Sequence, residues 1–356
     1  MDPTVVAAWI AAGVSVLTLM GTLAAQYFGR RGTKEDAEKA FAEQRDQLNE
    51  TLKAQSEHLD RTLDDQRTRT LNERFATAAE HLGSDKPAVR LAGVYAMAGL
   101  ADDWEENRQT CVDVICAHLR MHYEPDPGPD APTPRRLAFQ AIREVRHTVI
   151  RVITAHLQEN AAVSWQSLNL DFTGVVFDGG DFTGARFSRG RVSFTNAEFT
   201  GGTVNFIGAR FTGGTVNFNR AGFSGGRVDF SDARFSGSLV SFDGVRLTGG
   251  TIDFQYARFS RGQMDFSNAL FSGGTVDFRG AQFYGGLVHF DNVRFTGGTV
   301  GFRASGFSGS LFYFNRAEFS GGTVDFSRVR DWSTPPEFPW TNTPPVGVKL
   351  PPSGAA

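Results

Sequence analysis

Two histidines and two cysteines lie close together in one segment of the chain. His118 and His122 are four residues apart, so both would project from one face of a helix, and Cys111 and Cys116 precede them. Imidazole and thiolate groups are ligands that Zn²⁺ prefers, so a metal-dependent sensor or enzyme is one alternative for this segment. Because it has neither a CxxC pair nor an HExxH motif, we favour buried structural roles. We expect no catalytic residue, no cofactor and no metal site.

Charged residues further along the chain recur at a spacing of 24. The recurring acids are Asp229, Asp253 and Asp277, and the recurring bases are Arg210, Arg234 and Arg258. If one turn of a solenoid has the same length as this spacing, each set forms a column on the surface. One interpretation is a solvated surface on which the two columns compensate each other. The other is a charged face that binds a protein, a nucleic acid or a lipid headgroup.

A ladder of phenylalanines supports such a solenoid. The chain has 32 Phe and 40 Gly among 356 residues. From Phe187 to Phe326 the spacing alternates between 7 and 5, and of the 24 positions on this ladder 23 are Phe and one is Leu247. Self-similarity at a fixed period is typical of repeat architectures. Clear members of this structural ladder are Phe211, Phe218, Phe223, Phe230, Phe254, Phe259, Phe266 and Phe271.

The residue two before each Phe is also restricted. It is apolar in one half of the 12-residue repeat, as at Val204 and Val216, and mostly Ala in the other half, as at Ala197 and Ala209. Residues two apart on a strand point to the same side, so we expect both positions to face inward and the polar residues between them to face outward.

These units resemble pentapeptide repeats, whose pattern is A-[DN]-[LF]-x-x. Copies such as GDFTG (180–184), ARFSR (185–189) and AEFTG (197–201) match it directly. The resemblance implies a right-handed quadrilateral β-helix with the central Phe stacked inside. The upstream stretch 72–123 is similar to a helical segment found before the repeats in bacterial membrane-anchored members of the family.

The sequence departs from the family's usual 20-residue coil. Two residues are inserted near Gly-Gly in every other face, which gives 12-residue (5+7) repeats and coils that each consist of two such repeats. We interpret the insertions as bulges that glycine permits at alternate corners. The β-helix is predicted over 165–330, with a capping helix at 135–160. Trp332, Phe338 and Trp340 are expected to cover the last coil within a Pro-rich tail, 331–356, that is otherwise disordered.

The N-terminal region predicts a membrane anchor. After a short end at 1–3, the run 4–28 carries no charge and is long enough to cross the hydrocarbon core as a transmembrane helix. Arg30, Arg31 and Lys34 follow it, so the positive-inside rule puts the N-terminus outside and the C-terminal domain in the cytoplasm, at the plasma (inner) membrane. A reducing compartment also fits a chain with only two cysteines.

Helices are predicted between the anchor and the repeats. A polar helical stalk covers 33–82, a helical module 83–123, and a Pro-rich linker 124–134. Within the stalk the larger apolar residues are spaced 7, 4, 7 and 4 apart, an 11-residue period. This stripe fits a coiled coil between copies of the chain, and it also fits a solitary stalk or a helix that docks on the next unit. Its members are Phe41, Leu48, Leu52, Leu59 and Leu63.

The predicted fold class is therefore α + β-solenoid, with a transmembrane helix, a helical stalk or bundle and a pentapeptide-repeat β-helix. The best-known function in the family is mimicry of duplex DNA by an acidic rod that binds DNA gyrase. Residues 187–330 contain 15 Arg and no Lys against 8 Asp and 2 Glu, a charge of +5, which is the wrong sign for a DNA mimic.

We predict a non-enzymatic, membrane-tethered scaffold that presents a rigid β-helix to a cytoplasmic protein partner. Binding of nucleic acid or anionic lipid by the Arg columns is an alternative, as is the metal-dependent sensor or enzyme in the helical module.

Overall fold

A computed structural model describes Met20, Leu23 and residues 34–340 and 343–352. The chain divides into two compact units, 1–72 and 73–356. The long helix α2 (Lys34–Leu82) begins in the first unit and contains no Pro or Gly, which explains how it continues for 49 residues. The residue after its last turn is Gly83, the residue type that most often follows a helix.

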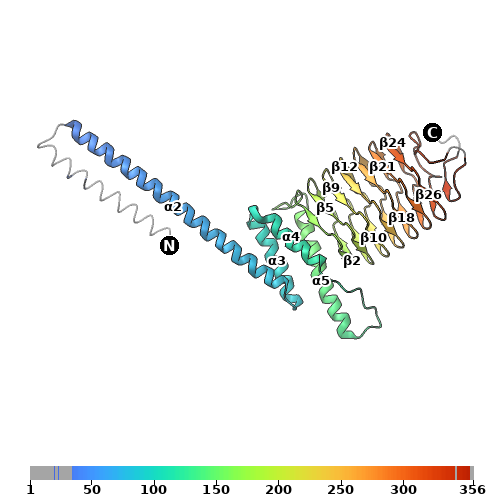
Figure 1. The fold of residues 1–356 in the computed structure, drawn as a ribbon, viewed down its shortest axis with the longest axis horizontal. Helices are drawn as coiled ribbons and strands as arrows, with labels where there is room; N and C mark the ends of the chain where they lie inside the picture. Colours follow the sequence, from blue (N-terminus) through green and yellow to red (C-terminus); the bar gives the residue numbers. More distant parts are fainter. Residues whose placement is uncertain (1–19, 21–22, 24–33, 341–342, 353–356) are drawn as a thin grey trace. The chain divides into compact units, whose positions relative to one another are not determined.

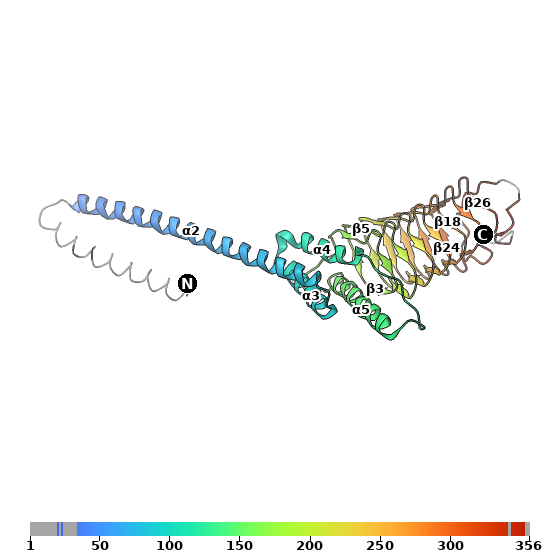
Figure 2. The same cartoon turned by 60° about the horizontal axis from the view of Figure 1, so that its bottom comes forward.

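The second unit begins with a group of short helices. They are α3 (Pro87–Asp103), the 3-10 turn η1 (Glu105–Asn107), α4 (Arg108–Arg120) and α5 (Thr133–His156). Pro87 occupies the first turn of α3, where its missing N–H costs no helical hydrogen bond. One apolar face of α5, which includes Val145, Val149 and Ile153, is buried. Figures 1 and 2 show α4 and α5 next to the first coils of the solenoid.

The rest of the unit is a β-solenoid of about seven turns, made of four parallel sheets that we call faces A to D. Face A consists of β1 (Leu170–Asp171), β5 (Arg191–Ser193), β9 (Thr215–Asn217), β13 (Leu239–Ser241), β17 (Gln263–Asp265), β21 (Leu287–His289) and β25 (Leu311–Tyr313). Face B consists of β2 (Val176–Phe177), β6 (Glu198–Phe199), β10 (Gly222–Phe223), β14 (Arg246–Leu247), β18 (Leu270–Phe271), β22 (Arg294–Phe295) and β26 (Glu318–Phe319).

The other two faces complete each coil. Face C consists of β3 (Gly180–Asp181), β7 (Thr203–Asn205), β11 (Arg227–Asp229), β15 (Thr251–Asp253), β19 (Thr275–Asp277), β23 (Thr299–Gly301), β27 (Thr323–Asp325) and β28 (Val348–Lys349). Face D consists of β4 (Arg186–Phe187), β8 (Arg210–Phe211), β12 (Arg234–Ser236), β16 (Arg258–Ser260), β20 (Gln282–Tyr284) and β24 (Gly306–Ser308).

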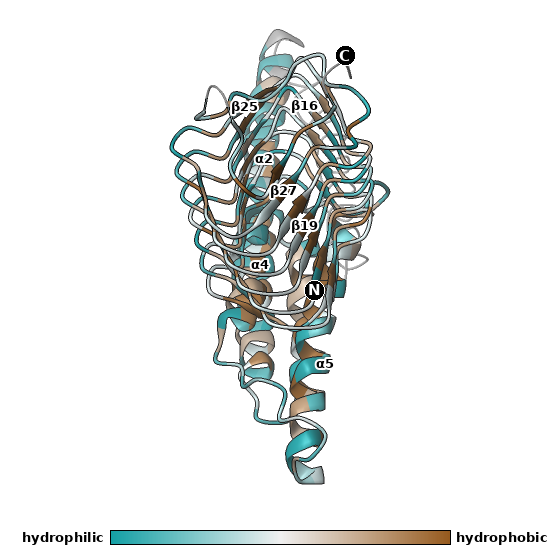
Figure 3. Ribbon diagram, turned by 90° about the vertical axis from the view of Figure 1, so that its right-hand side faces the viewer, coloured by the Kyte–Doolittle hydropathy of each residue, from teal (hydrophilic) through white to brown (hydrophobic). Residues whose placement is uncertain are grey.

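The register of the strands follows the repeat. Val228 pairs with Ile252 in the next coil, whereas at the start of the solenoid Leu170 pairs with Val192. The residue numbers differ by 24 in the first of these pairs and by 22 in the second, so the first coil is shorter, as its pentapeptide spacing indicates. Figure 3 looks along the stacked coils.

The phenylalanines form the core in columns that run along the solenoid. Phe206 stacks on Phe230 with ring centroids 4.8 Å apart, and Phe230 stacks on Phe254 at 5.0 Å. Neighbouring columns meet edge to face, as Phe218 and Phe230 do at 5.9 Å. Offset and edge-to-face contacts are the geometries that aromatic rings prefer. All eight ladder residues singled out in the sequence are buried.

The Pro-rich tail, predicted to be disordered beyond its aromatic residues, continues the solenoid for part of its length. Trp332 packs edge-on against Phe307, and Phe338 stacks on Phe314 at 5.3 Å. Further along, Val348 of β28 pairs with Val324 and adds a last strand to face C. The tail therefore covers the end of the core with its aromatic residues, as predicted, and its added strand β28 was not predicted.

The predicted membrane anchor requires a correction. Of the run 4–28 the structure describes only Met20 and Leu23, so the predicted span itself lies outside the described residues. Among the residues that are described, no helix is long and apolar enough to cross a membrane. The fold class is corrected to a helical N-terminal region followed by a β-solenoid. The predicted single-pass localisation, with the N-terminus outside and the C-terminal domain in the cytoplasm, is therefore not supported either.

Candidate interaction surface

The three aspartates of the predicted acidic column lie side by side in the structure, but their carboxylates are engaged in contacts within the protein. Asp229, Asp253 and Asp277 pair in register on face C. Asp253 is 1% exposed, and its burial raises the pKa of its carboxyl group. Arg227 forms ion pairs with both Asp229 and Asp253, and Gln255 donates to Asp253 at 3.0 Å. The charge of the column is therefore engaged in contacts within the protein, and little of it is free for a partner.

The predicted basic column is more open. Arg210, Arg234 and Arg258 pair in register on face D, with Arg186 preceding them. Glu159 forms ion pairs with Arg186 at 2.5 Å and with Arg210 at 3.5 Å. Arg234 and Arg258 are exposed and form no ion pair within the described residues. Only the second half of the column thus carries uncompensated charge.

Exposed apolar side chains are concentrated on face D and the adjoining edge of face A, which the sequence alone did not indicate. Seven large apolar or aromatic residues of the described solenoid are exposed, and five of them lie on face D, at its corners or on the adjoining edge of face A. These five are Leu239, Tyr256, Tyr284, Leu287 and Leu311. Together with Arg258 we call them the D–A surface.

The leucines of this surface form their own column. Leu239, Leu287 and Leu311 lie at the same register position of face A, with Gln263 between the first two. Their side chains are 40%, 37% and 47% exposed. In clear copies of the repeat this outward position is Thr, as in FTGGTV. The recurrence of Leu in place of Thr at the period of the coil is the signal that could have found the column.

An open hollow lies on face D between the two tyrosines. It is lined by Asp232, Tyr256, Arg258, Gly280, Gln282, Tyr284, Ala304 and Arg330. A Cβ atom at Gly280 would lie 2.6 Å from the Tyr256 ring, so the absence of a side chain there lets the ring lie over the backbone. The hydroxyl of Tyr284 donates to Gln282 Oε1 at 3.2 Å. The hollow thus combines two aromatic rings, small residues, two arginines and one aspartate.

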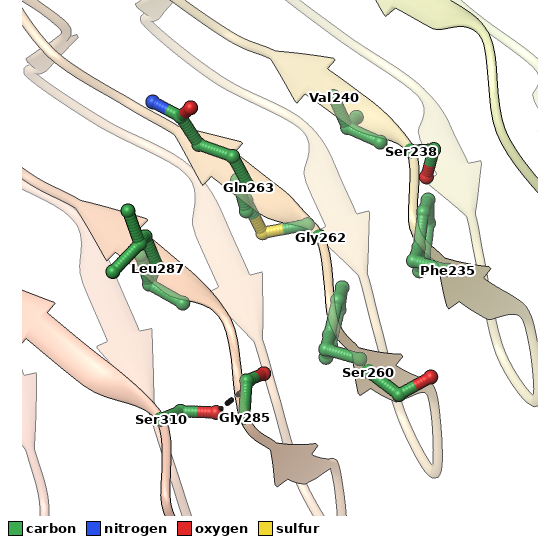
Figure 4. Close-up of a pocket in the computed structure, with 12 residues that line it drawn as sticks. Phe235, Ser238, Val240, Ser260, Gly262, Gln263, Gly285, Leu287 and Ser310 are labelled. Atoms are coloured by element: carbon green, nitrogen blue, oxygen red, sulfur yellow. Dashed lines mark hydrogen bonds between the residues drawn. The ribbon is translucent and has the colours of Figure 1, made fainter.

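A small cavity lies at the corner between faces D and A (Figure 4). Its volume is about 20 Å³, which is room for about one water molecule. Ser310 donates to the carbonyl of Gly285 at 2.9 Å, whereas the buried Ser238 Oγ has no protein partner among the described residues. The cavity is too small for a ligand, so it does not constitute a binding site.

The cysteines and histidines of the helical module differ in their exposure to solvent. Cys111, Cys116 and His118 are buried, and His122 is exposed. Burial, together with the charges of Arg90 and Arg146, lowers the pKa of His118 to about 4. Burial raises the pKa of Cys116 to about 12. Within the described residues no group of three or more His, Cys, Asp or Glu side chains could hold a metal ion.

A polar cluster joins the helices to the first coil. Asp178 Oδ2 accepts hydrogen bonds from Tyr123 and Arg143, both at 2.8 Å, and His147 Nε2 lies 3.2 Å from its Oδ1. Arg146 stacks over the Tyr123 ring at 4.1 Å. Because the carboxylate is occupied by these internal partners, the cluster fixes α5 on the solenoid and offers little to a ligand.

Comparison with known proteins supports the assignment of the repeat. The family model for pentapeptide repeats, in nine copies, matches residues 261–306. Searches of curated proteins and of solved structures found no match. The matched segment spans nearly two coils of a solenoid whose four faces and phenylalanine columns continue on both sides of it. This match and the β-solenoid together support assignment of the chain to the pentapeptide-repeat protein family.

Proposed function

We propose that the protein is a non-enzymatic interaction scaffold and that its D–A surface binds a protein partner. The pentapeptide-repeat β-solenoid is a structural and typically non-enzymatic type of fold. The observation that carries the proposal is that five of the seven exposed large apolar residues of the described solenoid lie on face D, at its corners or on the adjoining edge of face A, and that two of them, Tyr256 and Tyr284, line the same hollow as Arg258. Tyr and Arg are among the residues that contribute most to protein interfaces.

The chemistry of the surface favours a particular kind of partner. Arg258 and Arg330 line the hollow together with Asp232, and neither arginine forms an ion pair in the described chain, so an acidic side chain of the partner would compensate the positive charge that remains. Beside them, the leucine column would be covered by apolar side chains. The partner is therefore a protein segment that combines carboxylates with apolar residues. Because the solenoid is internally bonded from coil to coil, the surface is already formed before binding, which lowers the entropic cost.

Nucleic acid and anionic lipid fit this surface less well. Two of the four arginines of the column are compensated by Glu159, so few cations remain for a run of phosphates. The exposed leucine column on the adjoining edge of face A also has no counterpart in a phosphate backbone.

The experiment is an affinity capture from cells with the full chain as bait. The test variant combines Arg258→Glu with Tyr284→Ala. The matched control combines Arg294→Glu on face B with Tyr95→Ala on α3, where the arginine and the tyrosine are also exposed. We expect at least one protein whose recovery falls tenfold or more with the test variant and stays unchanged with the control. Equal recovery with both variants, or capture of nucleic acid or lipid alone, would contradict the proposal.

A further inference from the structure

The first unit carries an apolar stripe that is independent of the D–A surface. Phe41, Leu52, Leu59 and Leu63 of α2 are 41%, 42%, 46% and 53% exposed. Among the described side chains from Phe41 to Thr70, all are exposed except Leu48, which is half-buried. A long helix without tertiary packing is marginally stable, because most helical stability in proteins comes from burial of an apolar face.

The spacing of the stripe keeps it on one side of the helix. The period of 11 residues corresponds to about 3.67 residues per turn, close to the 3.6 of a straight helix. Phe41, Leu52 and Leu63 therefore stay nearly aligned over two such periods, or about 33 Å of helix length. A straight stripe of this length can be covered along its whole extent only by another extended element, such as a second helix.

The charge pattern around the stripe fits a helix as the covering element. On one flank the positions adjacent to the stripe are Gln44, Thr51, His58 and Thr62, with no Asp, Glu, Lys or Arg among them. The acids and bases lie mainly on the other flank and on the far side, as Glu50, Asp60 and Arg61 do. A helix that approaches from the uncharged flank would bury apolar and neutral side chains without removing a charge from water.

We propose that α2 associates with α2 of a second copy of this chain through the stripe at Phe41, Leu48, Leu52, Leu59 and Leu63. Two copies of the chain carry the same 7-4-7-4 spacing. In a parallel, in-register pair, each apolar layer of one helix therefore meets the same layer of the other. The narrowness of the stripe, with about two apolar residues per 11, favours two helices rather than a larger bundle.

The test measures the molar mass of the purified full chain by light scattering coupled to gel filtration. A mild detergent in the buffer keeps the uncharged run 4–28 from mediating association. The expected mass is twice the 38.8 kDa of one chain. Leu52→Gln combined with Leu59→Gln should return it to that of one chain. The matched control, Ala54→Gln with Arg61→Gln on the far side of the helix, should keep the doubled mass.

Thermal unfolding of the solenoid should be the same in all three proteins, because the substitutions lie outside 73–356. A single-chain mass for the unmodified protein would overturn the proposal, and so would a doubled mass that the stripe variant retains.

Discussion

The hydroxyl of Tyr123, at the end of the helical module, donates a hydrogen bond of 2.8 Å to Asp178 Oδ2 in the first coil of the solenoid. The two residues are 55 positions apart in sequence. Arg143 reaches the same carboxylate oxygen from α5. One carboxylate therefore connects three segments and contributes to the packing of the helices against the first coil.

The carboxylate of Asp178 should stabilise this unit. Asp178→Asn keeps the size of the side chain but removes the charge that Arg143 and His147 face, so we expect a loss of roughly 2–3 kcal/mol in the free energy of unfolding. Urea unfolding at neutral pH measures it. Asp181→Asn, at an exposed position of the same coil, should change the midpoint little, and equal losses in both variants would count against the cluster.

The same residue should make stability depend on pH. Burial alone would raise the pKa of Asp178, but hydrogen bonds from His147 and Tyr123 and the charge of Arg143 lower it from 3.8 to about 2. Because the pKa of Asp178 is lower in the folded than in the unfolded chain, the stabilisation is present above pH 4 and is lost as the pH falls toward 2, by about 2 kcal/mol in total.

Other carboxylates titrate in this range as well, so the measurement is the difference in unfolding free energy between the unmodified chain and Asp178→Asn. That difference should shrink below pH 4; a constant difference would contradict the prediction.

The phenylalanine columns should dominate the stability of the solenoid. Phe254 stacks between Phe230 and Phe278, at 5.0 and 4.9 Å. Phe254→Ala should lower the free energy of unfolding by about 3–5 kcal/mol, because it opens a cavity in a close-packed core. Phe254→Leu should cost only about 1 kcal/mol, since Leu247 already occupies a ladder position. Urea unfolding of the two variants measures both losses, and losses of similar size would show that the cavity is not the dominant cost.

At the corner formed by Gly201 and Gly202, the second glycine should be required and the first should not. Gly202 has a φ of 61°, and a Cβ atom there would lie 2.2 Å from the carbonyl oxygen of Asp178. Gly202→Ala should therefore destabilise the solenoid by at least about 1–2 kcal/mol. At the neighbouring Gly201 nothing lies within 4 Å of an added Cβ, so Gly201→Ala serves as the control and should leave the thermal midpoint almost unchanged.

Regular parts of the molecule could be predicted from sequence because the pattern that specifies them is local. The spacing of Phe and of its second neighbour gives the inward positions, the coil length and the columns of Arg and Asp. The cluster around Asp178 could not be predicted, because its partners lie 31 to 55 residues earlier in the sequence and only tertiary packing brings them together.

The D–A surface is an intermediate case. Leu239, Leu287 and Leu311 stand out as departures from the repeat, but their proximity to Tyr284 and Arg258 follows only when the register of faces D and A is known. The acidic column could be predicted from its spacing, but its contacts could not. Arg227 and Gln255 bind its carboxylates, and these contacts depend on side-chain geometry that the repeat does not specify.

The most direct test of the proposed scaffold function is photo-cross-linking in cells from the D–A surface. A benzophenone amino acid in place of Tyr284 in the full chain would react with whatever lies against the hollow. The same group in place of Tyr95, which is 60% exposed on α3, serves as the control. We predict a discrete protein adduct from position 284 that is absent from position 95. Identical adducts from both positions, or no protein adduct from position 284, would contradict the proposed function.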